Sequence, residues 1–285
     1  MNRKIWKALG IAVCMLALAA PRAMAKTYEV GTEDKFAEAV QEINKKSSDV
    51  ENEIVLMQDI TLERNYILTN GKTTTIKGKE GEDRKISING SNDPNAGITV
   101  TGEGTVLNLG ANGYDKKLTI DGDTRNGFVS VLEGATANMY EHVTLQNRMS
   151  TVNACVVIMG SDPATGSKSV FNMYGGVIEK CSRAVMVNKE ATFNMSSGEI
   201  RNCVSMNDGV GLYADNSTIN ISGGTISGCK GVWGGGLYAN NSTVTITDGT
   251  ISGCTVGAGG GLFVDSSTVR ISGGIISGCI TSDKG

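Results

Sequence analysis

Apolar and polar residues alternate with a period of two in three repeats that align without gaps near the C-terminal end of the chain. In the first repeat, Ile219 and Ile221 alternate with Thr218, Asn220 and Ser222. Strict alternation indicates short β-strands with one face buried and the other in water. The repeats follow one another at a spacing of 25 residues and cover 211–229, 236–254 and 261–279.

Each repeat predicts three short strands. A glycine pair, Gly223 and Gly224 in the first repeat, marks the turn after the alternating segment. A second strand then carries one inward isoleucine, and a third carries one inward leucine. These residues are Ile226, Ile251 and Ile276, and Leu212, Leu237 and Leu262. One repeat cannot bury its own apolar face, so we expect a solenoid of parallel sheets in which Ile221, Ile246 and Ile271 lie directly over one another.

Shorter copies of the repeat continue upstream. Residues 191–203 and 169–181 match its second half, and 136–147 is a weaker copy that places Asn147 in the column later held by cysteine. The spacing between copies varies from 22 to 34 residues, which we assign to loops, and regular rungs of 22–26 residues are expected from about residue 165. No helix-forming segment recurs, which excludes a leucine-rich repeat.

The N-terminal part predicts one helix ahead of the first rung. Residues 33–46 carry an apolar stripe of Phe36, Val40 and Ile43, with Thr32 as the N-cap. A helix at this place would cover the open apolar end of the stack.

The expected domain order is a cap at 26–52 followed by a β-helix at 53–285. Less regular rungs lead into the repeats. Their strand-like runs are 53–62, 73–76, 85–88, 98–100 and 117–120. The stack ends directly after a cysteine-column residue without a capping element, so we expect either a fragment of a longer protein or a partner that covers this end.

The cap helix, the IDG tripeptide at 120–122 and repeats of the form GGGLYANNSTVTITDGTISGC resemble the pectin-lyase-like right-handed parallel β-helix superfamily. They are most similar to its adhesin-like members on bacterial surfaces, of the polymorphic outer-membrane-protein type. The resemblance implies an all-β, right-handed parallel β-helix with three short strands per rung and a short N-terminal capping helix. The superfamily includes lyases, hydrolases, adhesins and passive stalks, so the fold does not select a function.

Residues 1–25 are typical of a signal peptide. Arg3, Lys4 and Lys7 give a positive start, an apolar run covers 8–20, and a small-x-small pattern ends at Ala25, where cleavage is expected. The rest of the chain has no apolar run long enough to form a transmembrane segment. We expect an exported protein, either secreted or held at the cell surface, with association to an outer membrane as a further option.

The charge balance after the signal peptide disfavours some partners. The first 25 residues hold four of the 26 basic residues and none of the 29 acidic ones, so the remainder has a net charge of −7. This charge argues against nucleic acid and against anionic membranes. Carbohydrate or a protein of a host or cell surface remains as the expected partner.

Five cysteines occupy one column of the repeat, and two arrangements are open. Neighbouring parallel strands lie about 4.8 Å apart, whereas the Cβ atoms of a disulfide lie about 3.8 Å apart, which favours a stack of buried thiols. Export nevertheless permits disulfides, and Cys155 is available to pair with the odd member. A metal site or cofactor is not expected, because there is no C-x-x-C pair and His142 is the only histidine. The column comprises Cys181, Cys203, Cys229, Cys254 and Cys279.

Catalytic candidates are few. Polysaccharide-cleaving β-helices need clustered carboxylates and a base, and Asp121, Asp123 and Arg125 in the segment TIDGDTRNG come closest to such a set. Asp121 and Gly122 also form an ordinary turn pair.

A second candidate pair, Glu141 and His142, replaces Gly175 and Gly176 of the next copy, which indicates a solvated turn. Residues 205–285 contain only eight charged residues, which leaves little acid or base for catalysis. The sequence therefore favours a protein that is not an enzyme.

An outward aromatic column is the candidate binding surface. If Leu212 and Ala214 point inward, Tyr213 points outward, and Tyr238 and Phe263 occupy the same position in the next two repeats. Such a column can hold a sugar or a protein partner, or it can be a self-stacked ladder that stabilises the sheet.

Three functions stay open on these observations. Export, regular uncharged rungs and the missing catalytic chemistry favour an adhesin-like binding or scaffold module. The superfamily resemblance alone supports a polysaccharide lyase or glycoside hydrolase. A passive structural stalk is the third alternative.

Overall fold

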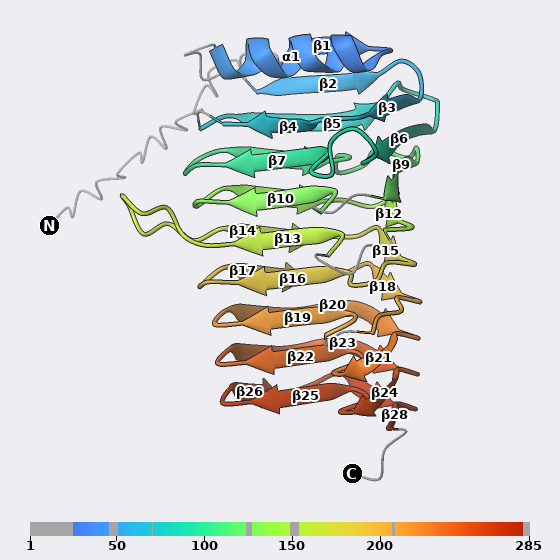
Figure 1. Cartoon of the computed structure of the whole chain (residues 1–285), viewed down its shortest axis with the longest axis vertical. Helices are drawn as coiled ribbons and strands as arrows, with labels where there is room; N and C mark the ends of the chain where they lie inside the picture. The colour runs from blue at the N-terminus through green and yellow to red at the C-terminus, as the bar shows by residue number, and fades with distance from the viewer. Residues whose placement is uncertain are drawn as a thin grey trace, which may run out of the picture.

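The computed structural model describes residues 25–45, 51–69, 71–123, 127–148, 154–206 and 209–281. Over these residues the chain is an all-β parallel solenoid of stacked coils, with a single short helix near the N-terminus (Figure 1). The expected solenoid with three strands per rung is confirmed. The predicted signal peptide lies outside the described residues, apart from Ala25.

The first wall of the solenoid contains the alternating strands of the repeat, and all its neighbours pair in parallel. Its strands are β1 (Lys26–Val30), β2 (Asn52–Leu56), β5 (Thr73–Gly78), β8 (Val106–Leu109), β11 (Thr136–Met139), β14 (Val170–Met173), β17 (Thr192–Met195), the first halves of β20 (Thr218–Ser227) and β23 (Thr243–Ser252), and β26 (Thr268–Ile271). Ile221 pairs with Ile246, and Ile246 with Ile271, as the repeat predicts.

An asparagine ladder runs along the outer side of the first wall. Each Nδ2 atom donates a hydrogen bond of 2.8 Å to the Oδ1 atom of the asparagine one rung before it. At the N-terminal end, Asn108 donates to Thr75 Oγ1 at 3.1 Å. The members are Asn108, Asn138, Asn172, Asn194 and Asn220. The ladder ties consecutive rungs together through side chains in addition to the backbone pairing.

The second wall carries the inward isoleucines. Its strands are β3 (Ile60–Leu62), β6 (Arg84–Asn89), β9 (Leu118–Asp123), β12 (Val143–Gln146), β15 (Val177–Glu179), β18 (Glu199–Arg201), the second halves of β20 and β23, and β27 (Ile275–Ser277). Ile226 pairs with Ile251, and Ile251 with Ile276, as expected. A small parallel sheet follows this wall in the last rungs. It contains β21 (Lys230–Trp233), β24 (Thr255–Ala258) and β28 (Ile280–Thr281).

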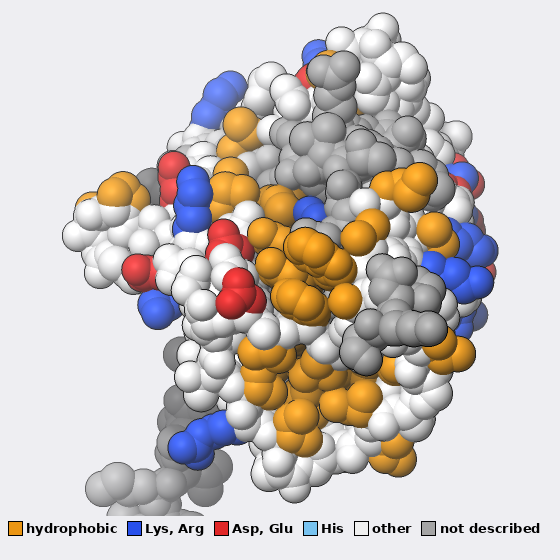
Figure 2. Space-filling view, turned by 60° about the horizontal axis from the view of Figure 1, so that its bottom comes forward, with side chains coloured by type: hydrophobic (Ala, Val, Ile, Leu, Met, Phe, Trp, Pro, Cys, Tyr) orange, Lys and Arg blue, Asp and Glu red, His pale blue; other side chains and the backbone are white. Residues whose placement is uncertain are grey.

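The third wall is an eight-stranded parallel sheet that carries the inward leucines. Its strands are β4 (Asn65–Leu68), β7 (Gly97–Thr101), β10 (Val129–Leu132), β13 (Val156–Met159), β16 (Val185–Asn188), β19 (Leu212–Asp215), β22 (Leu237–Asn240) and β25 (Leu262–Asp265). Leu212, Leu237 and Leu262 lie over one another. The core between the walls is continuous along the stack until the last described rung, where Ile271 is 52% exposed. Figure 2 shows hydrophobic side chains gathered at this end.

The helix α1 (Glu33–Lys45) lies across the N-terminal end of the stack (Figure 1). Lys35 N donates to Thr32 Oγ1 at 3.3 Å, which confirms Thr32 as the N-cap. The predicted apolar stripe is buried, and Phe36 meets the ring of Tyr66 edge to face at 5.0 Å. Lys46 lies outside the described residues.

An arginine, and not the expected asparagine, occupies the cysteine column in the rung before Cys181. Arg148 accepts a hydrogen bond from Ser182 N, just as Cys181 accepts one from Val204 N in the next rung, so Arg148 and not Asn147 occupies this column. The assignment of Asn147 was wrong because four residues separate Met139 from Thr144, whereas three separate their register partners Met173 and Val177. The Arg148 side chain is fully buried and donates to Ser182 Oγ at 3.4 Å.

The cysteines combine both expected arrangements. Cys155 and Cys181 form a disulfide across 26 residues of sequence. Cys203, Cys229 and Cys254 are free and buried, and Cys279 is free and partly exposed. The free thiols therefore continue the column below the disulfide.

The described part of the chain has no helix with the length and apolar character needed to cross a membrane.

Candidate binding groove

A groove of about 800 Å³ follows the corner between the first and second walls. Its lining comes from residues just before β6 and β9, and from the turns before β12, β15 and β18 together with residues of these three strands and of β20. Six neighbouring parallel strands span about 24 Å. The groove is therefore elongated along the stack, and a ligand lying in it would meet several rungs in turn.

Small turn residues keep the corner hollow. Gly176 has a φ of +80°, which a residue with a side chain adopts only with strain, and a Cβ atom built on it would lie 2.6 Å from Val143 O. The preceding copy has Glu141 and His142 in this turn, and both are exposed to solvent and line the groove. The solvated turn expected from the sequence is confirmed, and the structure adds that it borders a cavity.

The charged groups of the groove are mostly acidic, and the most buried of them is paired. Arg201 Nε donates to Glu179 Oε2 at 2.8 Å, and Arg201 Nη1 donates to Glu199 Oε2 at 2.5 Å. Burial raises the pKa of Glu179, but hydrogen bonds from Arg201 and Lys180 outweigh it, so the pKa lies below its ordinary value. The ionisable lining residues are Asp83, Asp115, Lys117, Glu141, His142, Glu179, Glu199 and Arg201.

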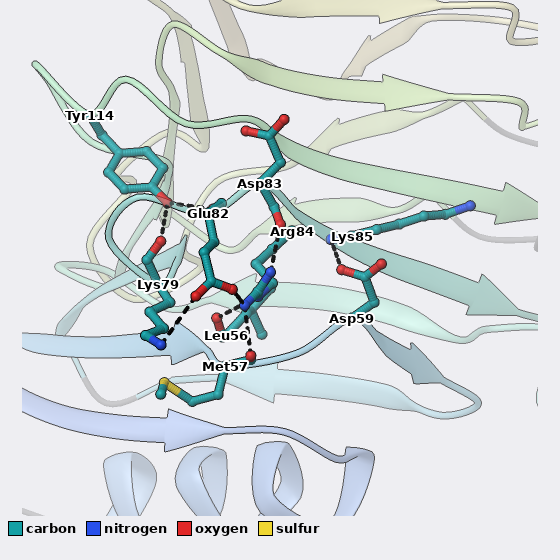
Figure 3. Close-up of polar contacts among 9 residues, drawn as sticks. All are labelled: Leu56, Met57, Asp59, Lys79, Glu82, Asp83, Arg84, Lys85 and Tyr114. Atoms are coloured by element: carbon teal, nitrogen blue, oxygen red, sulfur yellow. Dashed lines mark hydrogen bonds and ion pairs between the residues drawn. The ribbon is translucent and has the colours of Figure 1, made fainter.

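The loop between β8 and β9, residues 110–117, forms one side of the groove. Tyr114 Oη donates towards Lys79 O at 3.2 Å, and Asp83 Oδ1 accepts from Lys117 N at 2.8 Å. Figure 3 shows how the Tyr114 ring reaches the neighbouring loop. These bonds hold the loop against the rung before it.

Arg84 fixes this neighbouring loop in turn. Its guanidinium donates to Met57 O at 2.8 Å and Leu56 O at 3.2 Å, and it pairs with Glu82 (Figure 3). These acceptors belong to the preceding rung, so Arg84 holds the neighbouring loop against that rung. Tyr114 in turn donates its hydrogen bond to this held loop.

Two smaller cavities adjoin the groove at the loop. One of about 370 Å³ is lined by Asn112, Gly113, Tyr140, Glu141 and Tyr174 and shares Glu141 with the groove. The other, of about 320 Å³, shares Asp115 with the groove. Residues of the 110–117 loop therefore line three adjoining cavities. The repeat pattern alone does not predict these cavities.

Only one member of the predicted catalytic set, Asp121, has a side chain within the described residues. Asp121 lies within β9 rather than in a turn, and its carboxylate accepts from Lys85 at 2.8 Å, Asn147 at 2.9 Å and Gln146 at 3.2 Å. Burial raises the pKa of Asp121, but these hydrogen bonds together lower it below its ordinary value. Arg125 lies outside the described residues, as does the side chain of Asp123.

The predicted aromatic column is a closed stack. Tyr213 and Tyr238 have ring centroids 5.2 Å apart, and Tyr238 and Phe263 also 5.2 Å, with interplanar angles of 0° and 2°. Arg183 Cζ lies 4.6 Å from the Tyr213 ring, and Trp233 stacks on Phe263 at 5.6 Å. The ring faces are turned towards one another, so mainly ring edges remain for a ligand. The sequence pattern did not indicate Arg183 or Trp233, because neither repeats.

No family model, curated protein or solved structure matches this chain. The pectin-lyase-like resemblance therefore rests on sequence features alone, namely the cap helix, the IDG tripeptide and the repeats, whereas the strand pairing itself shows the parallel β-solenoid. Within the described ranges, no group of three or more histidine, cysteine or acidic side chains is arranged to hold a metal ion.

Proposed function

We propose that this protein is an exported, non-catalytic β-solenoid module that binds a linear polysaccharide along the corner groove, as a secreted or surface-held adhesin-like protein. The observation that carries the proposal is the elongated groove, which crosses successive rungs. A polymer of repeating units suits such a site, because successive rungs present their outward side chains at a constant spacing of about 4.8 Å.

The ionisation of two carboxylates, Glu179 in the groove and Asp121 in β9, supports binding rather than cleavage. A glycosidase needs a carboxylic acid whose raised pKa keeps it protonated near neutral pH. Glu179 and Asp121 have lowered pKa values and partners that stabilise the charged form. Both therefore serve as hydrogen-bond acceptors and not as proton donors.

Two further features support export and the exclusion of some partners. The leader resembles a signal peptide, and the Cys155–Cys181 disulfide suits an oxidising compartment. The net charge of −7 after the leader argues against nucleic acid.

Affinity electrophoresis of the mature chain in gels containing neutral or acidic polysaccharides tests the proposal. We expect retardation by a neutral polysaccharide, with no release of reducing ends or unsaturated products. Ser197→Trp fills the groove and should abolish retardation, whereas Ala164→Trp places the same bulk on a distant exposed loop and should not.

The other outcomes identify the alternatives. Product formation, with or without added calcium, would establish a lyase or hydrolase. Binding to cell-surface protein without binding to glycans would show a protein partner. A chain that binds neither would be a passive stalk.

A further inference from the structure

Two tyrosines at the edge of the groove differ from the closed aromatic column in the one respect that matters for sugar binding. Tyr140 and Tyr174 have ring centroids 5.5 Å apart but are tilted by 37° to each other. The rings in the column of Tyr213 and Tyr238 are parallel and cover one another. A tilted pair leaves more of its ring faces uncovered.

The residues above and below the tyrosine pair are small. Backbone hydrogen bonds place Gly110, Tyr140, Tyr174 and Ser196 at the same position of four successive rungs. Neither Gly110 nor Ser196 supplies a ring that could stack on the pair. Tyr174 is 46% exposed, so part of its side chain is open to a ligand.

Both tyrosines line a cavity. This cavity of about 370 Å³ lies between the tyrosines and residues 112–113 of the loop, with Glu141 at its junction with the groove. Tyr114, the next residue of the loop, is fastened to the preceding rung by its hydroxyl group. The hollow is thus bounded by aromatic rings on one side and by an anchored loop on the other.

We propose that Tyr140 and Tyr174 form the sugar-stacking subsite of the groove and that its ligand is a neutral hexopyranose unit. This inference rests on the proposed function and specifies its ligand class. A pyranose whose hydroxyl groups are mostly equatorial presents C–H groups on its faces, which pack on an aromatic ring, and polar groups at its edge. Asn112 and Glu141 supply hydrogen-bonding groups at that edge.

The charges around the subsite select against uronic acids. Glu141 borders the cavity, and Asp83 and Asp115 line the adjoining groove. Like charges brought together on binding are unfavourable. The hydroxyl groups of a neutral sugar can donate hydrogen bonds to these carboxylates, whereas the carboxylate of a uronate is repelled by them.

Isothermal titration of the mature chain with a neutral β-glucan oligosaccharide and with oligogalacturonate tests the subsite. Tyr174→Ala should weaken binding of the neutral oligosaccharide about tenfold or more, because it removes one stacking ring. Tyr174→Phe keeps the ring and should bind within about twofold of the wild type. Tyr238→Ala, in the closed column, is the matched control and should leave the affinity unchanged.

Circular dichroism and thermal melting of each variant establish that the fold is retained. Wild-type binding that survives Tyr174→Ala would overturn the subsite and leave the proposed function standing. Tighter binding of oligogalacturonate than of the neutral oligosaccharide would overturn the ligand class. A wild-type chain that binds no polysaccharide in either assay would overturn the proposed function and the subsite together.

Discussion

Arg201 joins two rungs of the groove by donating a hydrogen bond from Nε to Glu179 Oε2 over 2.8 Å. The two residues are register partners on β15 and β18, so the ion pair joins the same two neighbouring strands as the backbone hydrogen bonds. The Glu179 side chain is 11% exposed and that of Arg201 is 39% exposed. The pair is thus more sheltered than an ordinary surface salt bridge.

The stability supplied by this pair should depend on pH. Glu179 has a pKa lowered from 4.5 in the folded state, so its contribution is present above pH 4.5 and is lost as the pH falls through the lowered pKa. Arg201→Gln should cost about 1 kcal/mol in urea unfolding at pH 7, and this cost should shrink at acidic pH. Glu199→Gln removes only the more exposed partner and is expected to cost less. A cost of Arg201→Gln that is equal at pH 7 and pH 3 would contradict the prediction.

The asparagine ladder should stabilise the stack through its interior members more than through its end. Asn172 donates to Asn138 and accepts from Asn194, whereas Asn220 makes only the donor bond to Asn194 within the ladder. We expect Asn172→Ala to cost about 2 kcal/mol and Asn220→Ala about 1 kcal/mol. Urea unfolding of the two variants measures both, and equal costs would show that the ladder bonds do not contribute separately.

The buried aliphatic columns should follow the usual cost of cavity formation. Ile246 is 3% exposed and lies between Ile221 and Ile271, so Ile246→Ala should destabilise the fold by about 2–5 kcal/mol. Ile271 belongs to the same column but is 52% exposed, and Ile271→Ala should cost much less. Thermal unfolding of the two variants checks the contrast; similar losses would mean that Ile271 is covered in solution.

Alkylation of the denatured, non-reduced protein should separate the cysteines into two classes. Cys203, Cys229, Cys254 and Cys279 should be labelled, and Cys155 and Cys181 should appear as one linked peptide pair in mass spectrometry. The double variant Cys155→Ala/Cys181→Ala should lose about 3 kcal/mol of stability. A linked pair within the free column, such as Cys229 with Cys254, would contradict this assignment.

Most of the solenoid could be predicted from its repeats. Alternation at Ile219 and Ile221 and the recurring Leu212 positions specify which side of each strand is buried, and a one-residue slip would turn every side chain to the wrong face. This constraint explains why the stacked columns of Ile246 and Leu237 were predicted correctly.

Features without a repeat equivalent could not be found in this way. One extra residue between Met139 and Thr144 moved Arg148 into the cysteine column, and only the pairing of β11 with β14 and of β12 with β15 reveals it. The disulfide joins Cys181 to Cys155, which belongs to no repeated column. The groove likewise needs Tyr114 of one loop to contact the loop that contains Lys79, 35 residues earlier.

The sequence by itself determined the stacked parallel strands, the inward aliphatic columns and the N-terminal helix, because burial and backbone pairing act in the same way on each repeated unit. Only the tertiary structure decided which outward side chains meet. It stacked Tyr213 on Tyr238 with their faces covered and left Tyr140 and Tyr174 tilted beside a cavity. The reason is physical: repeats determine what lies one rung away, whereas the groove depends on loops of unequal length that contact each other only after the rungs have stacked.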